Sequence, residues 1–249
     1  MHKLGVGSMA TFARTQPDES QDHRAGAIIV AAGQSSRMNG VDKLFLPILG
    51  IPLIAHTLAA FEAATSTQSV ILVLSSANLE QGKAIVREYG FAKVHEVCLG
   101  GERRQDSVRR GLAHLAPYPW VIVHDGARPC VEHELIERGV EEAVRWGSAV
   151  AAVPVTDTIK VVGDQEIVLE TPDRRKLWAV QTPQIFSWEV LHRAYQQEDF
   201  NATDDSILVE RLGYPVHTFF GSYGNIKVTT REDVIMAETL LQRREGLTV

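Results

Sequence analysis

Two cations and a run of small residues lie close together near the start of the chain. Ala31-Ala32-Gly33 ends a short apolar stretch, and Arg37 and Lys43 follow in the polar segment after it. Small residues let a ligand approach the backbone closely, and backbone N–H groups beside Arg and Lys side chains bind anions well. The polyanion that fits such a loop best is a nucleoside triphosphate. The alternative is a plain strand-to-helix turn with two solvated cations.

Neither of the two common phosphate-binding fingerprints is present in this loop. Its glycine spacing matches neither the dinucleotide-binding pattern nor the P-loop. Two further polar segments, 100–107 and 124–129, each follow an apolar run in the same way. The chemistry therefore depends on whether the three segments meet in the folded chain.

The elements between these segments alternate in type. Apolar runs predict strands, and amphipathic stretches predict helices, at 27–32, 70–74, 79–89, 94–97, 120–123, 132–146 and 148–153. Alternation of this kind indicates an α/β fold with a doubly wound, mostly parallel, Rossmann-like sheet and helices on both faces. Ligands bind such sheets beyond the carboxyl ends of the strands, so segments 33–43, 100–107 and 124–129 are predicted to converge.

The alternation stops after residue 155. Segments 158–162 and 166–170 alternate apolar and polar residues around Gly163-Asp164-Gln165, which predicts a protruding β-hairpin arm at about 156–173. A two-stranded hairpin is marginally stable alone, so the arm needs a partner, either its own domain or another subunit. Near the C-terminus, Thr230-Arg231-Glu232-Asp233 resembles a capping box that opens the last helix.

Composition limits the classes of partner. The 249 residues are 45% hydrophobic and carry a net charge of −6, which argues against nucleic acid or a membrane surface as the main partner. Two cysteines, Cys98 and Cys130, are too few for a disulfide framework and fit a cytoplasmic location. Residues 1–24 are expected to be a disordered leader or tag remnant, and residues 25–245 a single domain.

Taken together, the polar segments resemble a known group of enzymes. Ala31-Ala32-Gly33 with Arg37-Met38 and Lys43, Gly100-Gly101 with Arg104 and Asp106-Ser107-Val108, and His124-Asp125-Gly126-Ala127-Arg128-Pro129 resemble nucleotidyltransferases that activate sugar or polyol phosphates. Further motifs narrow the resemblance: Asp157-Thr158, Asp173-Arg174, Leu177-Trp178, Gln181-Thr182-Pro183-Gln184, Thr203-Asp204 and Asn225-Ile226-Lys227-Val228-Thr229. This ordered series is similar to the 2-C-methyl-D-erythritol 4-phosphate cytidylyltransferase family.

The resemblance implies a reaction and a set of site residues. CTP and a polyol phosphate would give a CDP-polyol and pyrophosphate, with Mg²⁺ held mainly by the substrate phosphates. The implied catalytic residues are Arg37, Lys43 and Lys227. The implied nucleotide-binding residues are Ala31, Ala32, Gly33, Gly101, Glu102, Ser107, Asp125 and Gly126. The implied acceptor-binding residues are Asp125, Arg128, Thr158, Arg174, Thr182, Thr203 and Lys227, with no dedicated protein metal site.

Simpler interpretations remain for several of these residues. Asp125 could cap a helix, Ser107 could belong to an ordinary turn, and the threonines could serve strand propensity or helix capping. A ribitol 5-phosphate cytidylyltransferase is an alternative enzyme, and a non-catalytic nucleotide-binding regulator is a more distant one. The resemblance also implies a homodimer that exchanges its hairpin arms, so that Thr158 and Arg174 would enter the neighbouring subunit's site.

Overall fold

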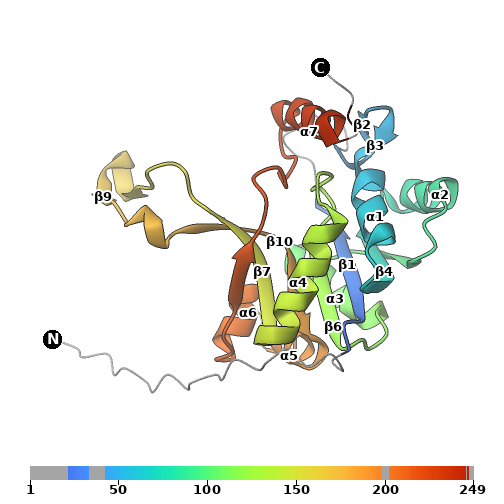
Figure 1. The fold of residues 1–249 in the computed structure, drawn as a ribbon, viewed down its shortest axis with the longest axis horizontal. Helices are drawn as coiled ribbons and strands as arrows, with labels where there is room; N and C mark the ends of the chain where they lie inside the picture. The colour runs from blue at the N-terminus through green and yellow to red at the C-terminus, as the bar shows by residue number, and fades with distance from the viewer. Residues whose placement is uncertain (1–21, 34–42, 198–201, 245, 247–249) are drawn as a thin grey trace.

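A central seven-stranded sheet organises the chain in the computed structural model (Figure 1), which describes residues 22–33, 43–197, 202–244 and 246. The strand order is β11-β7-β10-β6-β1-β4-β5. One half consists of the parallel strands β1 (Ala25–Ala31), β4 (Thr67–Leu74), β5 (Val94–Leu99) and β6 (Trp120–Asp125). The other half consists of β7 (Ser148–Pro154), β10 (Trp178–Ser187) and β11 (His217–Phe220).

One strand runs against the rest. β10 lies between β6 and β7 and pairs with both in antiparallel fashion, whereas β11 pairs with β7 in parallel. The predicted mostly parallel sheet is confirmed, and β10 is its exception. Because β10 reverses direction there, it brings Gln181 and Thr182 beside the end of β6 at Asp125.

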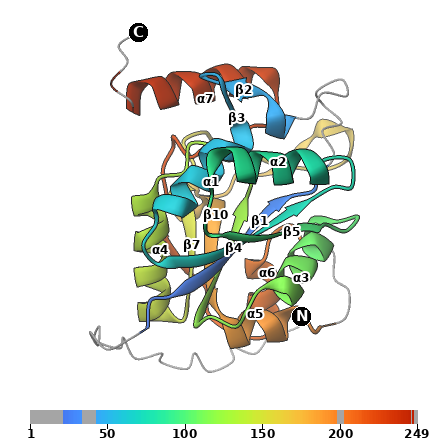
Figure 2. The ribbon, with the colours of Figure 1, turned by 90° about the vertical axis from the view of Figure 1, so that its right-hand side faces the viewer.

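Helices cover both faces of the sheet, as predicted (Figure 2). One core holds the apolar faces of α1 (Leu53–Ala63), α2 (Leu79–Tyr89), α4 (His133–Trp146) and α7 (Arg231–Arg244). The core on the opposite face holds those of α3 (Arg104–His114), α5 (Trp188–Ala194) and α6 (Ser206–Arg211). Side chains of β1 alternate between the two cores, Ile28 in one and Ile29 in the other.

Local sequence signals place the helix ends. Gly90 and Gly147 end α2 and α4 in the left-handed conformation, which glycine adopts without the steric cost of a Cβ atom. At the start of α7, Asp233 accepts hydrogen bonds from the backbone N–H groups of Thr229 and Thr230, and its own N–H donates to Thr230 Oγ1. The predicted capping box is therefore present.

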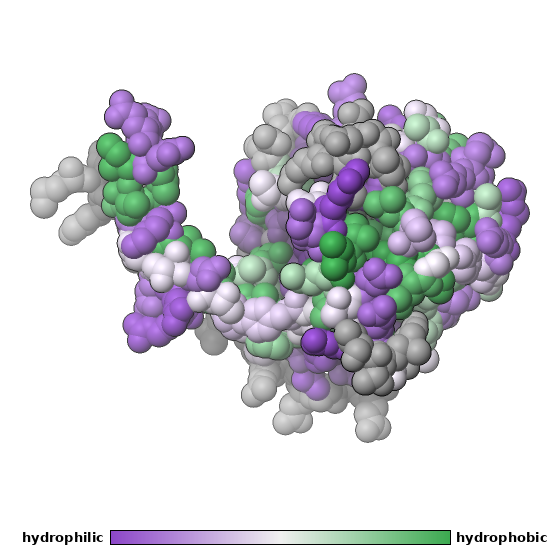
Figure 3. Space-filling model, turned by 90° about the horizontal axis from the view of Figure 1, so that it is seen from above, coloured by the Kyte–Doolittle hydropathy of each residue, from purple (hydrophilic) through white to green (hydrophobic). Residues whose placement is uncertain are grey.

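The predicted hairpin is also present and projects from the body (Figures 1 and 3). Strands β8 (Val161–Val162) and β9 (Val168–Glu170) form their own two-stranded sheet, shorter than the predicted strands 158–162 and 166–170, and the short 3₁₀ helix Asp164–Glu166 lies between them. The arm exposes large apolar side chains, among them Leu169 at 69% and Ile167 at 59%. A second short hairpin, β2 (Pro47–Ile48) and β3 (Ile51–Pro52), leads into α1.

At the N-terminal boundary, residues 22–24 contact the body. Trp120 Nε1 donates to the carbonyl of Asp22, and Arg24 forms an ion pair with Asp22. The disordered leader was predicted for residues 1–24; residues 22–24 instead make these contacts, and residues 1–21 lie outside the described residues. In the part of the chain that the structure describes, no helix combines the length and the apolar character needed to cross a bilayer.

Candidate active site

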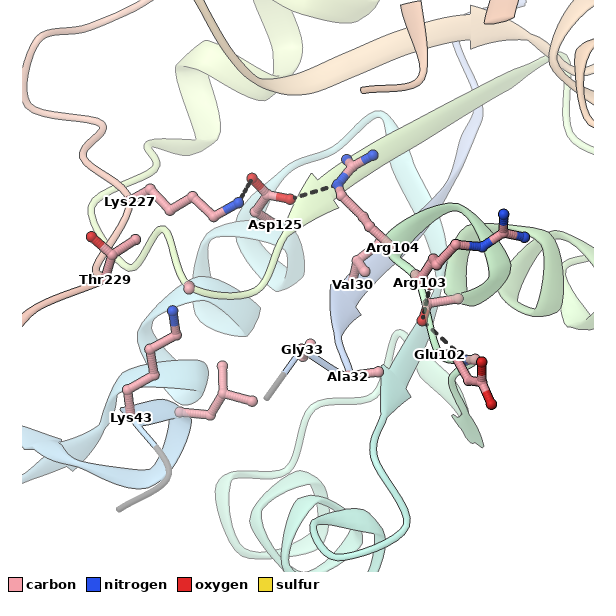
Figure 4. Close-up of a pocket in the computed structure, with 15 residues that line it drawn as sticks. Val30, Ala32, Gly33, Lys43, Glu102, Arg103, Arg104, Asp125, Lys227 and Thr229 are labelled. Atoms are coloured by element: carbon pink, nitrogen blue, oxygen red, sulfur yellow. Dashed lines mark hydrogen bonds and ion pairs between the residues drawn. The ribbon is translucent and has the colours of Figure 1, made fainter. Parts of the chain in front are cut away.

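Two adjoining cavities open beyond the carboxyl ends of the parallel strands. The first has a volume of about 250 Å³ (Figure 4). Its walls come from the ends of β1 and β6, the loop before α3, and Lys43 on the 3₁₀ helix Lys43–Phe45. The predicted convergence of three polar segments at this edge of the sheet is therefore confirmed for their described residues.

The loop before α3 leaves no room for side chains at its two glycines. A Cβ atom at Gly100 would lie 2.2 Å from Ala32 Cβ, and one at Gly101 would lie 2.3 Å from Asp106 Cβ. The loop is held by Ser107, whose Oγ accepts from the Gly101 N–H at 3.1 Å and donates to the Arg103 carbonyl at 3.2 Å. Ser107 thus fixes the loop that forms one wall of the first cavity.

The second cavity, about 260 Å³, lies between the end of β6 and the antiparallel strand β10. Its walls are richer in polar and charged residues than in apolar ones. They are formed by Arg104, Asp125, Arg128, Val180, Gln181, Thr182, Gln184, Thr203, Asp204 and Lys227.

Among the described residues, Arg104, Asp125 and Lys227 line both cavities. The Asp125 carboxylate lies 3.1 Å from Arg104 Nε and 2.9 Å from Lys227 Nζ (Figure 4). Arg128 Nε lies 3.6 Å from the same carboxylate. One buried carboxylate thus gathers three cations at the boundary between two cavities.

These cations determine the charge state of Asp125. Burial alone would raise the pKa of its carboxyl group, but the charges of Arg104, Lys227 and Arg128 outweigh burial and hold that pKa well below its usual range. Asp125 is therefore ionised at neutral pH. Its backbone is fixed as well, because its N–H donates to Thr182 Oγ1 at 3.0 Å.

The neighbouring residue, His124, is fully buried and neutral. Burial lowers the pKa of its imidazole to about 3, although the charge of Asp125 acts in the opposite direction. Its Nδ1 lies 3.1 Å from Thr182 Oγ1. Thr182 thus contacts two consecutive residues of β6, which indicates a structural use for its hydroxyl group at the wall of the second cavity.

Hydrogen bonds on both sides of Lys227 fix the loop that carries it. The Asn225 side chain donates to the Thr182 carbonyl at 2.8 Å, and the Val228 N–H donates to the Ala127 carbonyl at 2.8 Å. Arg128 Nη1 donates to the Asn225 carbonyl at 2.8 Å. Lys227 therefore extends towards Asp125 from a segment tied to both neighbouring loops.

Most of the predicted site residues lie around these cavities. The first is lined by Ala31, Ala32, Gly33, Lys43, Gly101, Glu102, Ser107, Asp125 and Lys227. The second is lined by Asp125, Arg128, Thr182, Thr203 and Lys227. Gly126 lies just behind the first, where a Cβ atom would come within 2.9 Å of Ala31 Cβ and Ile54 Cδ1.

Three predicted residues are placed differently. Arg37 lies outside the described residues. Thr158 and Arg174 are exposed at the base of the projecting arm and line neither cavity of their own chain. Arg174 Nη1 donates to the Thr156 carbonyl at 2.7 Å.

Arg104 is the main site residue to which sequence analysis gave no role. It stands in the recognised Gly100–Ser107 motif, but its partners Asp125 and Asp205 are distant in sequence. Gln184 and Asp204 also line the second cavity, and Gln184 Nε2 donates to Asp204 Oδ2 at 3.0 Å. Asp204 and Asp205 follow Thr203 directly, and this acidic pair after a motif threonine is a signal that could have identified them.

Similarity to known proteins extends over nearly all of the described chain. The profile of the 2-C-methyl-D-erythritol 4-phosphate cytidylyltransferase family matches residues 25–243. A protein with that name from Dehalococcoides mccartyi is 48% identical over 222 residues, which cover 89% of this chain and 98% of the relative. One from Alkaliphilus metalliredigens is 45% identical, covering 88% and 94%.

Solved structures show the same relationship. The crystal structure of 4-diphosphocytidyl-2C-methyl-D-erythritol synthase from Anaerococcus prevotii superposes with a TM-score of 0.80 at 29% identity, covering 91% of this chain and all of that one. The cytidylyltransferase from Thermus thermophilus has a TM-score of 0.72 at 33% identity, covering 88% and 99%. Sequence and fold agree, and the chain belongs to the 2-C-methyl-D-erythritol 4-phosphate cytidylyltransferase family.

Proposed function

We propose that this enzyme transfers the cytidylyl group of CTP to 2-C-methyl-D-erythritol 4-phosphate, giving the CDP-polyol and pyrophosphate in the non-mevalonate route to isoprenoids. The supporting observation is the boundary formed by Arg104, Asp125 and Lys227 between two cavities. The first cavity takes the nucleotide and the second takes the polyol phosphate. The two reacting phosphorus centres then meet at this boundary.

Charge neutralisation is the main task of such a site. An oxygen of the polyol phosphate forms a bond to the α-phosphorus, and the bond from that phosphorus to the leaving pyrophosphate breaks. Both reactants are anions, and the attacking phosphate is already ionised at neutral pH, so the step needs no general base. Lys43 and Lys227 supply positive charge on the nucleotide side, and Arg128 supplies it on the acceptor side.

The small residues that line the first cavity recognise the nucleotide. The backbone at Ala31 to Gly33 and at Gly101 and Glu102 presents N–H and C=O groups at the cavity wall. The absence of side chains at Gly100 and Gly101 lets this loop pack closely against Ala32 and Asp106 beside the cavity. Backbone groups in that position can read the small edge of a pyrimidine.

Mg²⁺ belongs to the proposal as an ion held mainly by the substrate phosphates. The described residues contain no group of three or more His, Cys, Asp or Glu side chains arranged to hold a metal ion. Asp125 could contribute one oxygen ligand, and phosphate oxygens and water would supply the others. When bound, Mg²⁺ would neutralise phosphate charge alongside the lysines.

A homodimer with exchanged arms is also part of the proposal. The arm exposes Leu169 and Ile167, and its base continues into exposed apolar residues of the body at Trp178, Val180 and Phe220. An apolar surface of this kind is typical of an interface, and a second copy would cover it. Arg174 of one subunit would then enter the acceptor cavity of the other.

A cytoplasmic location is the last part of the proposal. Cys98 and Cys130 are buried free thiols, and burial raises the pKa of each to about 11. Such thiols are compatible with a reducing compartment. Fractionation of the source cells, with the protein followed by antibody, would test this part.

The experiment for the reaction is a pyrophosphate-release assay with each nucleoside triphosphate against methylerythritol 4-phosphate and ribitol 5-phosphate. We expect release with CTP and the methylerythritol phosphate, and little with ATP, GTP or UTP. Equal rates with the ribitol phosphate, or no release with the methylerythritol phosphate, would contradict the proposed acceptor. Nucleotide binding without any release would instead indicate a regulator.

A further inference from the structure

We propose that Arg104 is a positioning residue, held by a buried Tyr195–Asp205 pair so that Asp125 and Lys227 stand correctly at the boundary between the cavities. This inference rests on the proposed function, gives Arg104 a defined role in it and adds two residues, Tyr195 and Asp205. Neither Tyr195 nor Asp205 lines either cavity. The side-chain contact that leads from this pair to the cavities is the ion pair between Asp205 and Arg104.

The contacts form a continuous chain from the protein interior to the site. Tyr195 Oη donates to Asp205 Oδ1 at 2.5 Å, and Asp205 Oδ2 forms an ion pair with Arg104 Nη1 at 2.7 Å. The Arg104 Nε atom donates to Asp125 Oδ1 at 3.1 Å, and the other Asp125 oxygen contacts Lys227 Nζ. Five side chains from separate elements are thereby linked.

Burial makes the inner part of this chain rigid. The Asp205 side chain is completely buried and that of Arg104 is 24% exposed. Burial disfavours the ionised form of Tyr195, and the charge of Asp205 disfavours it further, so the pKa of Tyr195 is raised well above its usual value. Tyr195 therefore remains a hydrogen-bond donor to Asp205, while the ion pair with Arg104 compensates the charge of the buried Asp205 carboxylate.

Arginine suits this position for a geometric reason. Its planar guanidinium group directs Nε and Nη1 at two different carboxylates at once, Asp125 on β6 and Asp205 beside α6. A lysine would carry the same charge, but its single ammonium group would favour one carboxylate. The inference therefore concerns geometry and not charge alone.

The contacts of Arg104 also connect the walls of the two cavities. Asp205 follows Thr203 and Asp204, which line the acceptor cavity, and Asp125 borders the nucleotide cavity. Arg104 thus ties an acceptor-side segment to the residue that holds Lys227. We infer that displacing Arg104 disturbs the transfer step more than it disturbs the binding of CTP.

The first test is Arg104→Lys, assayed for kcat and for the KM of each substrate. We expect kcat to fall by roughly 10²-fold, the usual scale for a lost electrostatic contact, while the KM for CTP stays within about threefold. Arg109→Lys, an exposed change on the same helix, is the matched control and should behave as wild type. A raised KM for CTP with unchanged kcat would overturn the inference.

The second test avoids the site and remains informative if Arg104→Lys does not fold. Tyr195→Phe keeps the ring and removes the hydrogen bond to Asp205, and we expect kcat to fall by about threefold to tenfold. Combined with Arg104→Lys it should add almost nothing, because both changes break the same chain. Tyr89→Phe, on the outer edge of α2, is the control.

The outcomes separate this inference from the proposed function. An inactive wild-type enzyme in the pyrophosphate assay would contradict the proposed function. An active wild type together with a Tyr195→Phe variant of unchanged kcat would overturn only the role of the buried pair. Multiplicative losses in the double variant would likewise show that Tyr195 and Arg104 act independently.

Discussion

Asp125 is an unusual strand-end aspartate because three cations contact its single carboxylate. Among the described residues that line the two cavities, five are cations and three are carboxylates, so the site favours anions; the cations are Lys43, Arg103, Arg104, Arg128 and Lys227, and the carboxylates are Glu102, Asp125 and Asp204. A net positive site matches a reaction between a triphosphate and a phosphate monoester. Asp125 thus holds the cations in place, while their excess charge remains for the substrates.

Lys43 can be tested directly. Lys43→Ala should lower kcat by roughly 10²-fold, because one cation facing the charge that develops at the α-phosphorus is lost. Steady-state kinetics would measure this, with the KM for the polyol phosphate changing less. Lys83→Ala, which removes a lysine paired with Glu80 on the surface of α2, is the matched control. A folded Lys43→Ala enzyme with near-normal kcat would show that Lys43 is a surface charge with no part in the transfer step.

His124 gives a prediction on stability. Its pKa is about 3 in the folded protein and about 6.5 when exposed, so the unfolded chain binds more protons at mildly acid pH. The contribution of neutral, buried His124 to the free energy of unfolding is complete above about pH 6.5 and is lost as the pH falls towards 3. Between pH 7.5 and 5.5, the free energy of unfolding of the wild type should fall by roughly 1 kcal/mol more than that of His124→Gln.

Urea denaturation of both proteins at the two pH values would measure this difference. Parallel pH dependences for wild type and His124→Gln would contradict a neutral, buried His124.

At the scale of elements, local signals explain which parts of the fold were predictable. Helix α2 has the predicted ends because Gly90 terminates it, and the capping box at Thr230 begins α7. Each signal involves residues within one turn of one another. The three polar segments converge because the carboxyl ends of parallel strands must share one edge of the sheet.

Contacts between residues far apart in the sequence account for the features of the fold and the site that local patterns could not predict. The placement of β10 between β6 and β7 depends on antiparallel ladders with two strands at once, and no local pattern specifies that order. Arg104 lies in a recognised motif, but its proposed role depends on the ion pair with Asp205. These two residues are distant in the sequence and come together only in the folded chain. The acceptor-binding residues of the second cavity were named through the family resemblance, but the pairing of β10 that brings them together follows from no local pattern.

The start of α7 offers a test at this scale. Asp233→Ala should lower the free energy of unfolding by about 1–2 kcal/mol, because the Asp233 carboxylate accepts from Thr229 and Thr230 where the helix begins. Thr229 lines the first cavity, so a modest rise in the KM for CTP should accompany the loss. Denaturant titration with Glu232→Ala as the exposed neighbouring control would measure it, and equal stabilities would argue against the cap.

At the scale of the whole molecule, the arm is the part that a single chain leaves unexplained. Within the described part of the chain, its two short strands pair only with each other, and their apolar side chains are exposed. Such a hairpin is marginal alone. Arg174 at its base lies outside both cavities of its own chain, which is the arrangement expected if its function lies in a second copy.

Mixing two inactive variants tests that exchange. Lys43→Ala damages the body of the site and Arg174→Ala damages the arm, so neither homodimer should be active. With exchanged arms, a mixed dimer contains one fully native site and one site that carries both changes. Random pairing makes half of the dimers mixed, so about one quarter of all sites should recover activity after equal amounts are dissociated and re-associated. Subunit exchange is verified separately with two affinity tags. Arms that fold back onto their own chain would leave every site with one defect, and verified mixed dimers would then show no recovery.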